Sequence, residues 1–195
     1  MKIEAKFETK NNKLYGISSG LEISVDFNSA MPVADFCKNS GGFAAIKDKI
    51  SGSSEPGPAE KVMAVILPWK KVEPETEAYD EAFLADFREV LKQAEENDLF
   101  VVILPSADGF SAEKAEGFTA AMKHAARRIK DCSSVVGFAV PDELAVSGFG
   151  EGQPAAYFIE ELSCKHAHYV YFAKKTAAEK SGSLSGGIQL PLVLY

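Results

Sequence analysis

Two adjacent carboxylates stand where a buried strand is expected to end. Asp142 and Glu143 follow Pro141, and this proline ends the apolar run 135–140. A carboxyl group just beyond a buried strand is partly shielded from water, which suits a general acid. A structural interpretation is equally open, because an acidic residue after a proline can simply cap a helix or a turn. Asp142 and Glu143 are therefore candidates for acid–base chemistry or for ligand binding.

The only tryptophan, Trp69, stands in the same place relative to an earlier strand. It follows Pro68, which ends the apolar run 62–67. An indole at a strand end offers a flat face on which the apolar side of a sugar ring can stack. The alternative is that Trp69 packs into the core and closes the end of the sheet. Trp69 is thus a candidate substrate-binding residue.

Three β/α units position these side chains. Val62–Leu67, Leu99–Leu104 and Val135–Val140 are short apolar runs that end at prolines, which predicts buried strands. Between them, Asp80 and Ser111 begin stretches with apolar residues every three or four positions, a spacing typical of amphipathic helices. Alternating strands and helices favour a parallel sheet, in which ligands bind at the carboxyl ends of the strands. The three strand ends are therefore expected to share one mouth.

The segments on either side complete one α/β domain over residues 1–195. Residues 1–30 alternate apolar and polar side chains around Asn11-Asn12, which predicts antiparallel N-terminal strands joined by a hairpin turn. The remaining expectations are short helices over Met31–Ser40 and Phe43–Ile50, a Ser-, Gly- and Pro-rich loop over 51–58, β/α units over 61–180 with a helix from Pro154 to Tyr169, and a C-terminal loop and edge strand over 181–195.

The charge of the chain argues against two classes of partner. The formal net charge is −7 at pH 7, and the acidity is concentrated between Glu73 and Asp98. A negative surface repels phosphate backbones and anionic lipids, so neither nucleic acid nor a membrane is an expected partner. No apolar run reaches the roughly 18 residues of a membrane-spanning helix.

The cysteines bear on localisation and on metal binding. Cys37, Cys132 and Cys164 are odd in number and far apart, which favours reduced thiols in a cytoplasmic protein. A secreted protein that has lost its signal peptide would look the same. Cys164 and His168 share one face of the expected helix, but His166 points away from them, so no metal site is expected and no cofactor either.

Several short motifs, taken in order, resemble one family. Pro68-Trp69, Val72-Glu73-Pro74 and Tyr79-Asp80 lie between two apolar strands, and a later strand, 135–138, is followed by Asp142-Glu143. This order is similar to that of the clan A glycoside hydrolases, the cellulase-like barrel enzymes. In these enzymes one strand ends in a tryptophan, and a later strand ends in Asn-Glu-Pro, whose Glu is the acid/base. The resemblance extends over roughly residues 14–172.

The resemblance implies a TIM-barrel-like (β/α) fold with Glu143 at the acid/base position. A full barrel needs about 250 residues, so an incomplete or shrunken barrel is expected. Asp142 and Leu144 replace the Asn and the Pro that flank the family's catalytic Glu. A retaining enzyme also needs a second carboxylate about 5 Å away as nucleophile, and the late segment Ile188–Leu194 contains no acidic residue.

The leading hypothesis is a degenerate glycoside-hydrolase-like domain. It would bind a carbohydrate at the strand ends through Trp69, Asp142 and Glu143 without efficient hydrolysis. One alternative is an active glycoside hydrolase with Glu143 as acid/base and an unidentified nucleophile. Another is a non-catalytic structural or interaction module. Because an unclosed sheet exposes an edge, a homodimer that covers the open side of the barrel is a further hypothesis.

Overall fold

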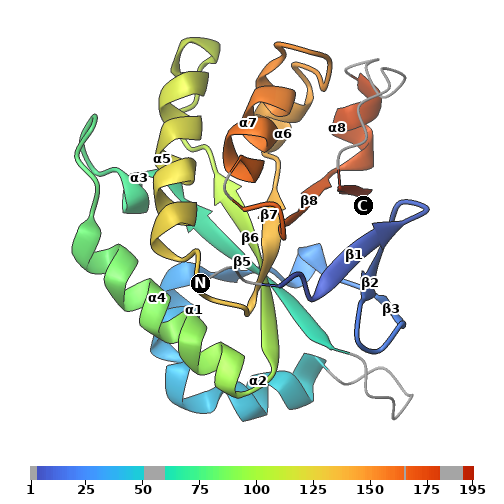
Figure 1. The fold of residues 1–195 in the computed structure, drawn as a ribbon. Helices are drawn as coiled ribbons and strands as arrows, with labels where there is room; N and C mark the ends of the chain where they lie inside the picture. Colours follow the sequence, from blue (N-terminus) through green and yellow to red (C-terminus); the bar gives the residue numbers. More distant parts are fainter. Residues whose placement is uncertain (1–3, 51–59, 165, 181–190) are drawn as a thin grey trace.

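A parallel sheet of six strands forms the centre of the protein (Figure 1). The computed structural model describes residues 4–50, 60–164, 166–180 and 191–195. The strands follow one another across the sheet in chain order, and every neighbouring pair is parallel, so each connection is a crossover. The six strands are β4 (Met31–Pro32), β5 (Lys61–Pro68), β6 (Leu99–Ser106), β7 (Val135–Ala139), β8 (Val170–Ala173) and β9 (Leu192–Leu194).

Helices cover the outer face of this sheet. Strand residues such as Val65, Ile103 and Phe138 pack there with Phe87 and Phe118, which belong to two of the helices. All of these side chains are fully buried. The helices are α1 (Val33–Lys38), α2 (Phe43–Ile50), α3 (Trp69–Val72), α4 (Glu81–Glu96), α5 (Ala115–Arg128), α6 (Asp142–Ala145), α7 (Pro154–Ser163) and α8 (Lys175–Lys180), with 3-10 turns at Phe27–Ser29, Ser40–Gly42 and Ala112–Lys114.

A small antiparallel sheet covers the inner face. It consists of β1 (Phe7–Lys10), β2 (Lys13–Gly16) and β3 (Glu22–Ile23) and lies on the side away from the helices, next to β8 and the C-terminus (Figure 1). Phe7, Leu14 and Ile23 pack against strand residues that alternate with the outward-facing ones, among them Phe100 and Val102. This alternation is the period of two expected of a strand. The parallel sheet is therefore buried on both faces.

Most of the expected elements are confirmed. The three central strands, the N-terminal hairpin at Asn11-Asn12 and the helices that follow Asp80 and Pro154 are all present. Asp80 caps α4 as expected, since its side chain accepts the backbone N–H of Phe83 at 2.9 Å. The expected loop over 51–58 lies outside the described residues.

The expected helices over Met31–Ser40 and from Pro154 to Tyr169 were wrong where each meets a short strand. Met31 does not begin a helix, because Pro32 is extended with ψ at 139° and α1 starts only at Val33; Met31–Pro32 instead forms β4, so parallel pairing begins before residue 61. The helix from Pro154 ends at Ser163, and Val170–Ala173 is a fully buried strand. The helical spacing of apolar residues continues to Tyr169 by coincidence. It led to a helix prediction next to Val170–Ala173, whose valine and aromatic residues have high strand propensity.

Candidate functional site

A hollow of about 360 Å³ lies at the carboxyl ends of the central strands. Its charged side chains come from the loop after β6, the start of α6 and the residue after β8. Its aromatic side chains come from the 3-10 turn Phe27–Ser29 and from the residue after β9. We call it the mouth hollow. Its charged and aromatic lining residues are Asp108, Asp142, Glu143, Lys174, Phe27 and Tyr195.

Asp142 and Glu143 come together in the mouth hollow as the sequence predicts. Pro141 ends the extended backbone after β7, and the two carboxylates occupy the first turn of the four-residue helix α6. Both acids thus lie at a helix start, but the N-cap position is Pro141 and α6 has no side-chain cap hydrogen bond, so the capping interpretation is not borne out. Their position at a helix start does not exclude a binding role, because both residues line the hollow.

The expected shielding of these carboxylates from water is not found. Asp142 keeps 45% of its side-chain surface exposed, and Glu143 is exposed. Asp142 instead forms an ion pair, in which its Oδ2 atom lies 2.6 Å from the Nζ atom of Lys174. Lys174 follows β8 directly, so the lysine was missed together with that strand. A basic residue just after a fourth buried apolar run is the signal that could have identified it.

The stacked rings of Phe27 and Tyr195 form an aromatic wall in the mouth hollow. The centroids of Phe27 and Tyr195 are 3.7 Å apart with an interplanar angle of 14°. Backbone hydrogen bonds hold Tyr195 beside β8, from its N–H to Ala173 O at 3.0 Å and from Lys175 N–H to its carbonyl at 2.8 Å. Burial, with a smaller contribution from the nearby Asp142 carboxylate, raises the pKa of Tyr195 to about 12. Tyr195 is therefore a neutral phenol at physiological pH.

Trp69 lies in an adjacent hollow of about 430 Å³. Its indole N–H donates a hydrogen bond to Glu73 Oε2 at 2.6 Å, and its ring meets Phe118 edge-on with centroids 5.4 Å apart. Trp69 is thus half-buried against the core and also lines a hollow, so both interpretations of this residue hold in part. We call this second space the tryptophan hollow.

Asp108 connects the two hollows, because it lines both. It follows β6, between the strand that leads to Trp69 and the strand that leads to Asp142. The structure therefore places the sequence-predicted residues in two neighbouring hollows rather than one. Asp142 and Glu143 share the mouth hollow, and Trp69 lies in the tryptophan hollow.

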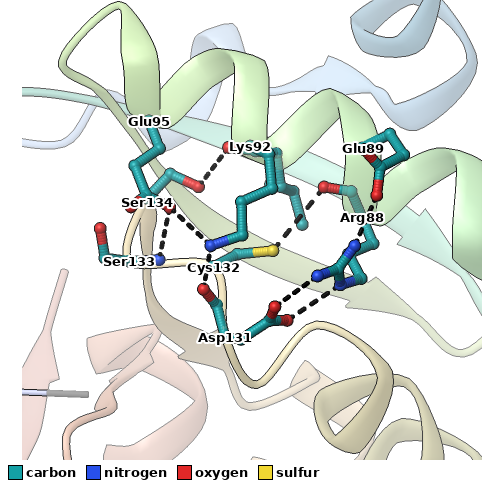
Figure 2. A network of polar contacts seen from close by, with 9 residues as sticks. Arg88, Glu89, Lys92, Glu95, Asp131, Cys132, Ser133 and Ser134 are labelled. Atoms are coloured by element: carbon teal, nitrogen blue, oxygen red, sulfur yellow. Dashed lines mark hydrogen bonds and ion pairs between the residues drawn. The ribbon is translucent and has the colours of Figure 1, made fainter. Parts of the chain in front are cut away.

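A second polar cluster joins α4 to the residues that precede β7 (Figure 2). Arg88 donates from Nε to Asp131 Oδ1 at 3.0 Å and from Nη2 to Asp131 Oδ2. Glu95 accepts the backbone N–H of Ser133 at 3.0 Å. Burial raises the pKa of the Cys132 thiol to about 12, which disfavours the thiolate form that a nucleophilic cysteine needs. The cluster lies at the amino end of β7, away from both hollows, and ties helix to sheet.

Comparisons with solved structures identify a similar fold. The catalytic domain of endoglucanase Cel5A from Thermobifida fusca, in a complex with cellotetraose, matches 97% of this chain and 63% of its own with a TM-score of 0.63 at 11% identity. The fold is similar to that of the clan A glycoside hydrolases. Endo-glycoceramidase II from a Rhodococcus species matches 74% of this chain and 47% of its own with a TM-score of 0.51 at 13% identity. This chain spans less than two thirds of the length of either enzyme.

No protein-family model matches the sequence, and no curated protein does. Within the described parts of the chain, no cluster of three or more His, Cys, Asp or Glu side chains could hold a metal ion. Among the described helices, none has the length and apolar character needed to cross a membrane.

Proposed function

We propose that this chain is a degenerate glycoside-hydrolase-like domain that binds a carbohydrate across the mouth hollow and the tryptophan hollow. The observation that carries the proposal is the composition of these two neighbouring hollows, which share Asp108. Carboxylates and a lysine supply partners for sugar hydroxyl groups, while Tyr195 and Trp69 supply aromatic surface. Sites for small ligands combine apolar and aromatic walls with a few polar groups in this way.

The same geometry favours binding over hydrolysis. A general acid must be protonated at working pH, and enzymes achieve this by removing the carboxyl group from water. Glu143 is exposed, and the neighbouring Asp142 is held by Lys174. The exposure of Glu143 and the ion pair of Asp142 support a site that recognises a sugar without cleaving it.

Trp69 provides a direct test of binding, because it is the only tryptophan of the chain. The experiment is a fluorescence titration with a panel that includes cello-oligosaccharides, supported by calorimetry. We expect a saturable change in Trp69 emission for at least one oligosaccharide, weakened by Asp142→Asn and by Trp69→Phe in calorimetry. Glu96→Gln is the matched control, because Glu96 is an exposed carboxylate on α4 outside both hollows. Neither heat nor fluorescence change with any member of the panel would contradict the proposal.

An active glycoside hydrolase is the second candidate, and one observation favours testing it. Asp108, Asp142 and Glu143 all line the mouth hollow, and two carboxylates are the minimum for either hydrolytic geometry. Aryl glycosides are the simplest substrates for the assay. We expect no turnover above background. Turnover that disappears in Glu143→Gln, while Glu96→Gln retains it, would replace the binding proposal by a catalytic one.

A further inference from the structure

One edge of the parallel sheet is occupied by a side chain. Among the described strands, β9 is the last in the sheet order, and it pairs with β8 on one side. Its backbone groups on the other side would ordinarily be free to pair with another strand, which is how edge strands promote association. The N–H of Tyr195 bonds to Ala173 of β8, so the N–H and C=O of the preceding residue, Leu194, face away from β8.

The side-chain amide of Asn12 meets both of these groups. The N–H of Leu194 donates to Asn12 Oδ1 at 2.6 Å, and Asn12 Nδ2 donates to the carbonyl of Leu194 at 3.5 Å. A paired strand would offer one acceptor and one donor to the same residue. A single amide group here offers both, in the place of a neighbouring strand.

The hairpin turn between β1 and β2 brings Asn12 to this edge. Lys10 pairs with Lys13, so Asn11 and Asn12 form a two-residue turn, and both have positive φ angles of 51° and 62°. Turns of this kind favour glycine, especially at the second position, because glycine adopts a positive φ without steric cost. Asparagine at position 12 makes a contact that glycine cannot.

We propose that Asn12 is an internal strand mimic that closes the β9 edge against pairing with a strand from a second copy of the chain. The contact links the N-terminal sheet to the C-terminal strand. Because Tyr195 follows Leu194 directly, the same contact also steadies the segment that brings Tyr195 into the mouth hollow.

The test compares three variants by amide hydrogen exchange and sedimentation velocity. Asn12→Gly removes the amide and keeps a turn that favours positive φ, so the hairpin itself is retained. Asn12→Asp keeps the acceptor for the Leu194 N–H and loses the donor. Asn11→Gly alters the same turn without touching Leu194 and serves as the matched control.

We expect the Leu194 amide to exchange about tenfold faster in Asn12→Gly, while the amides of β2 keep their protection. Asn12→Asp should give a smaller increase, and Asn11→Gly none. Asn12→Gly should also form a larger, concentration-dependent species than the wild-type protein. Unchanged Leu194 exchange in Asn12→Gly would overturn the contact. Faster exchange without any new association, or the same association in Asn11→Gly, would overturn the edge-closing role.

Discussion

Gly137 is the residue of the parallel sheet at which a single added methyl group should do most damage. It lies in β7 opposite Val170 of β8. A Cβ atom built at Gly137 would lie 1.7 Å from the carbonyl oxygen of Val170 and within 2.8 Å of two further backbone atoms of that residue. Both the Cβ position and the obstacle are fixed by backbone, so no side-chain rotation relieves the overlap.

The cost of Gly137→Ala follows from this geometry. Overpacking in a core typically costs about 1–3 kcal/mol when side chains can adjust. Here β7 and β8 must separate, which also weakens local hydrogen bonds worth about 1 kcal/mol each. We therefore expect a loss of about 3–5 kcal/mol, a large part of the roughly 5–15 kcal/mol that stabilises a typical domain.

Urea unfolding, followed by the fluorescence of Trp69, measures this loss. The matched control is Gly117→Ala in α5, where an added Cβ would meet only Trp69 Cζ2 at an ordinary 3.9 Å. Replacing glycine inside a helix should stabilise the protein by about 0.5–1 kcal/mol. If the free energy of unfolding of Gly137→Ala lies within about 1 kcal/mol of the wild-type value, β7 and β8 do not approach each other as closely as described.

Three further predictions concern the outer layer. Hydrogen bonds from Arg88 lower the pKa of Asp131 in the folded state. The Asp131 carboxylate therefore stabilises the fold above the unfolded pKa of about 4, and this stabilisation is lost as the pH falls further. In Asp131→Asn, the decline of the urea midpoint between about pH 5 and pH 3 should be flatter than in the wild-type protein. Iodoacetamide at pH 8 should modify the exposed Cys164 and leave the buried Cys132 intact in the native protein, and equal labelling in mass spectra would refute this. Asp80→Ala should cost about 1 kcal/mol in chemical unfolding through the lost cap of α4, and an unchanged midpoint would contradict it.

The sequence allowed prediction of those elements whose signals are local. Pro68, Pro105 and Pro141 lie at or just beyond the ends of three apolar runs, and each run forms a strand of the sheet. Asp80 predicted the start of α4 correctly, because an N-cap side chain bonds to a backbone N–H only two or three residues further along the chain. The location of Asp142 at a strand end followed from the same kind of signal, together with the rule that parallel strands end on one side.

The remaining residues of the site depend on contacts between distant segments. Phe27 and Tyr195 stack across almost the whole length of the sequence, and no local pattern of either segment indicates a partner. Alternation over residues 1–30 predicted N-terminal strands, but after the hairpin only Glu22–Ile23 pairs, and Phe27 lies in a turn. Trp69 was placed at the correct strand end, yet its contact with Phe118 of α5 puts it in a separate hollow.

The arrangement of the sheets bears on whether a second copy is needed to cover the open barrel. The sheet order ends at β4 and β9, so within the described residues the six strands do not close into a ring. Nevertheless, β1–β3 bury the inner face of the sheet. At one edge, β4 is only two residues long and includes Pro32, which has no backbone N–H to donate. At the other edge, the side chain of Asn12 accepts a hydrogen bond from β9. Each of these features removes a reason for association through the sheet. A homodimer that covers the open side of the barrel stays a prediction, and a clean monomer in sedimentation of the wild-type protein would contradict it.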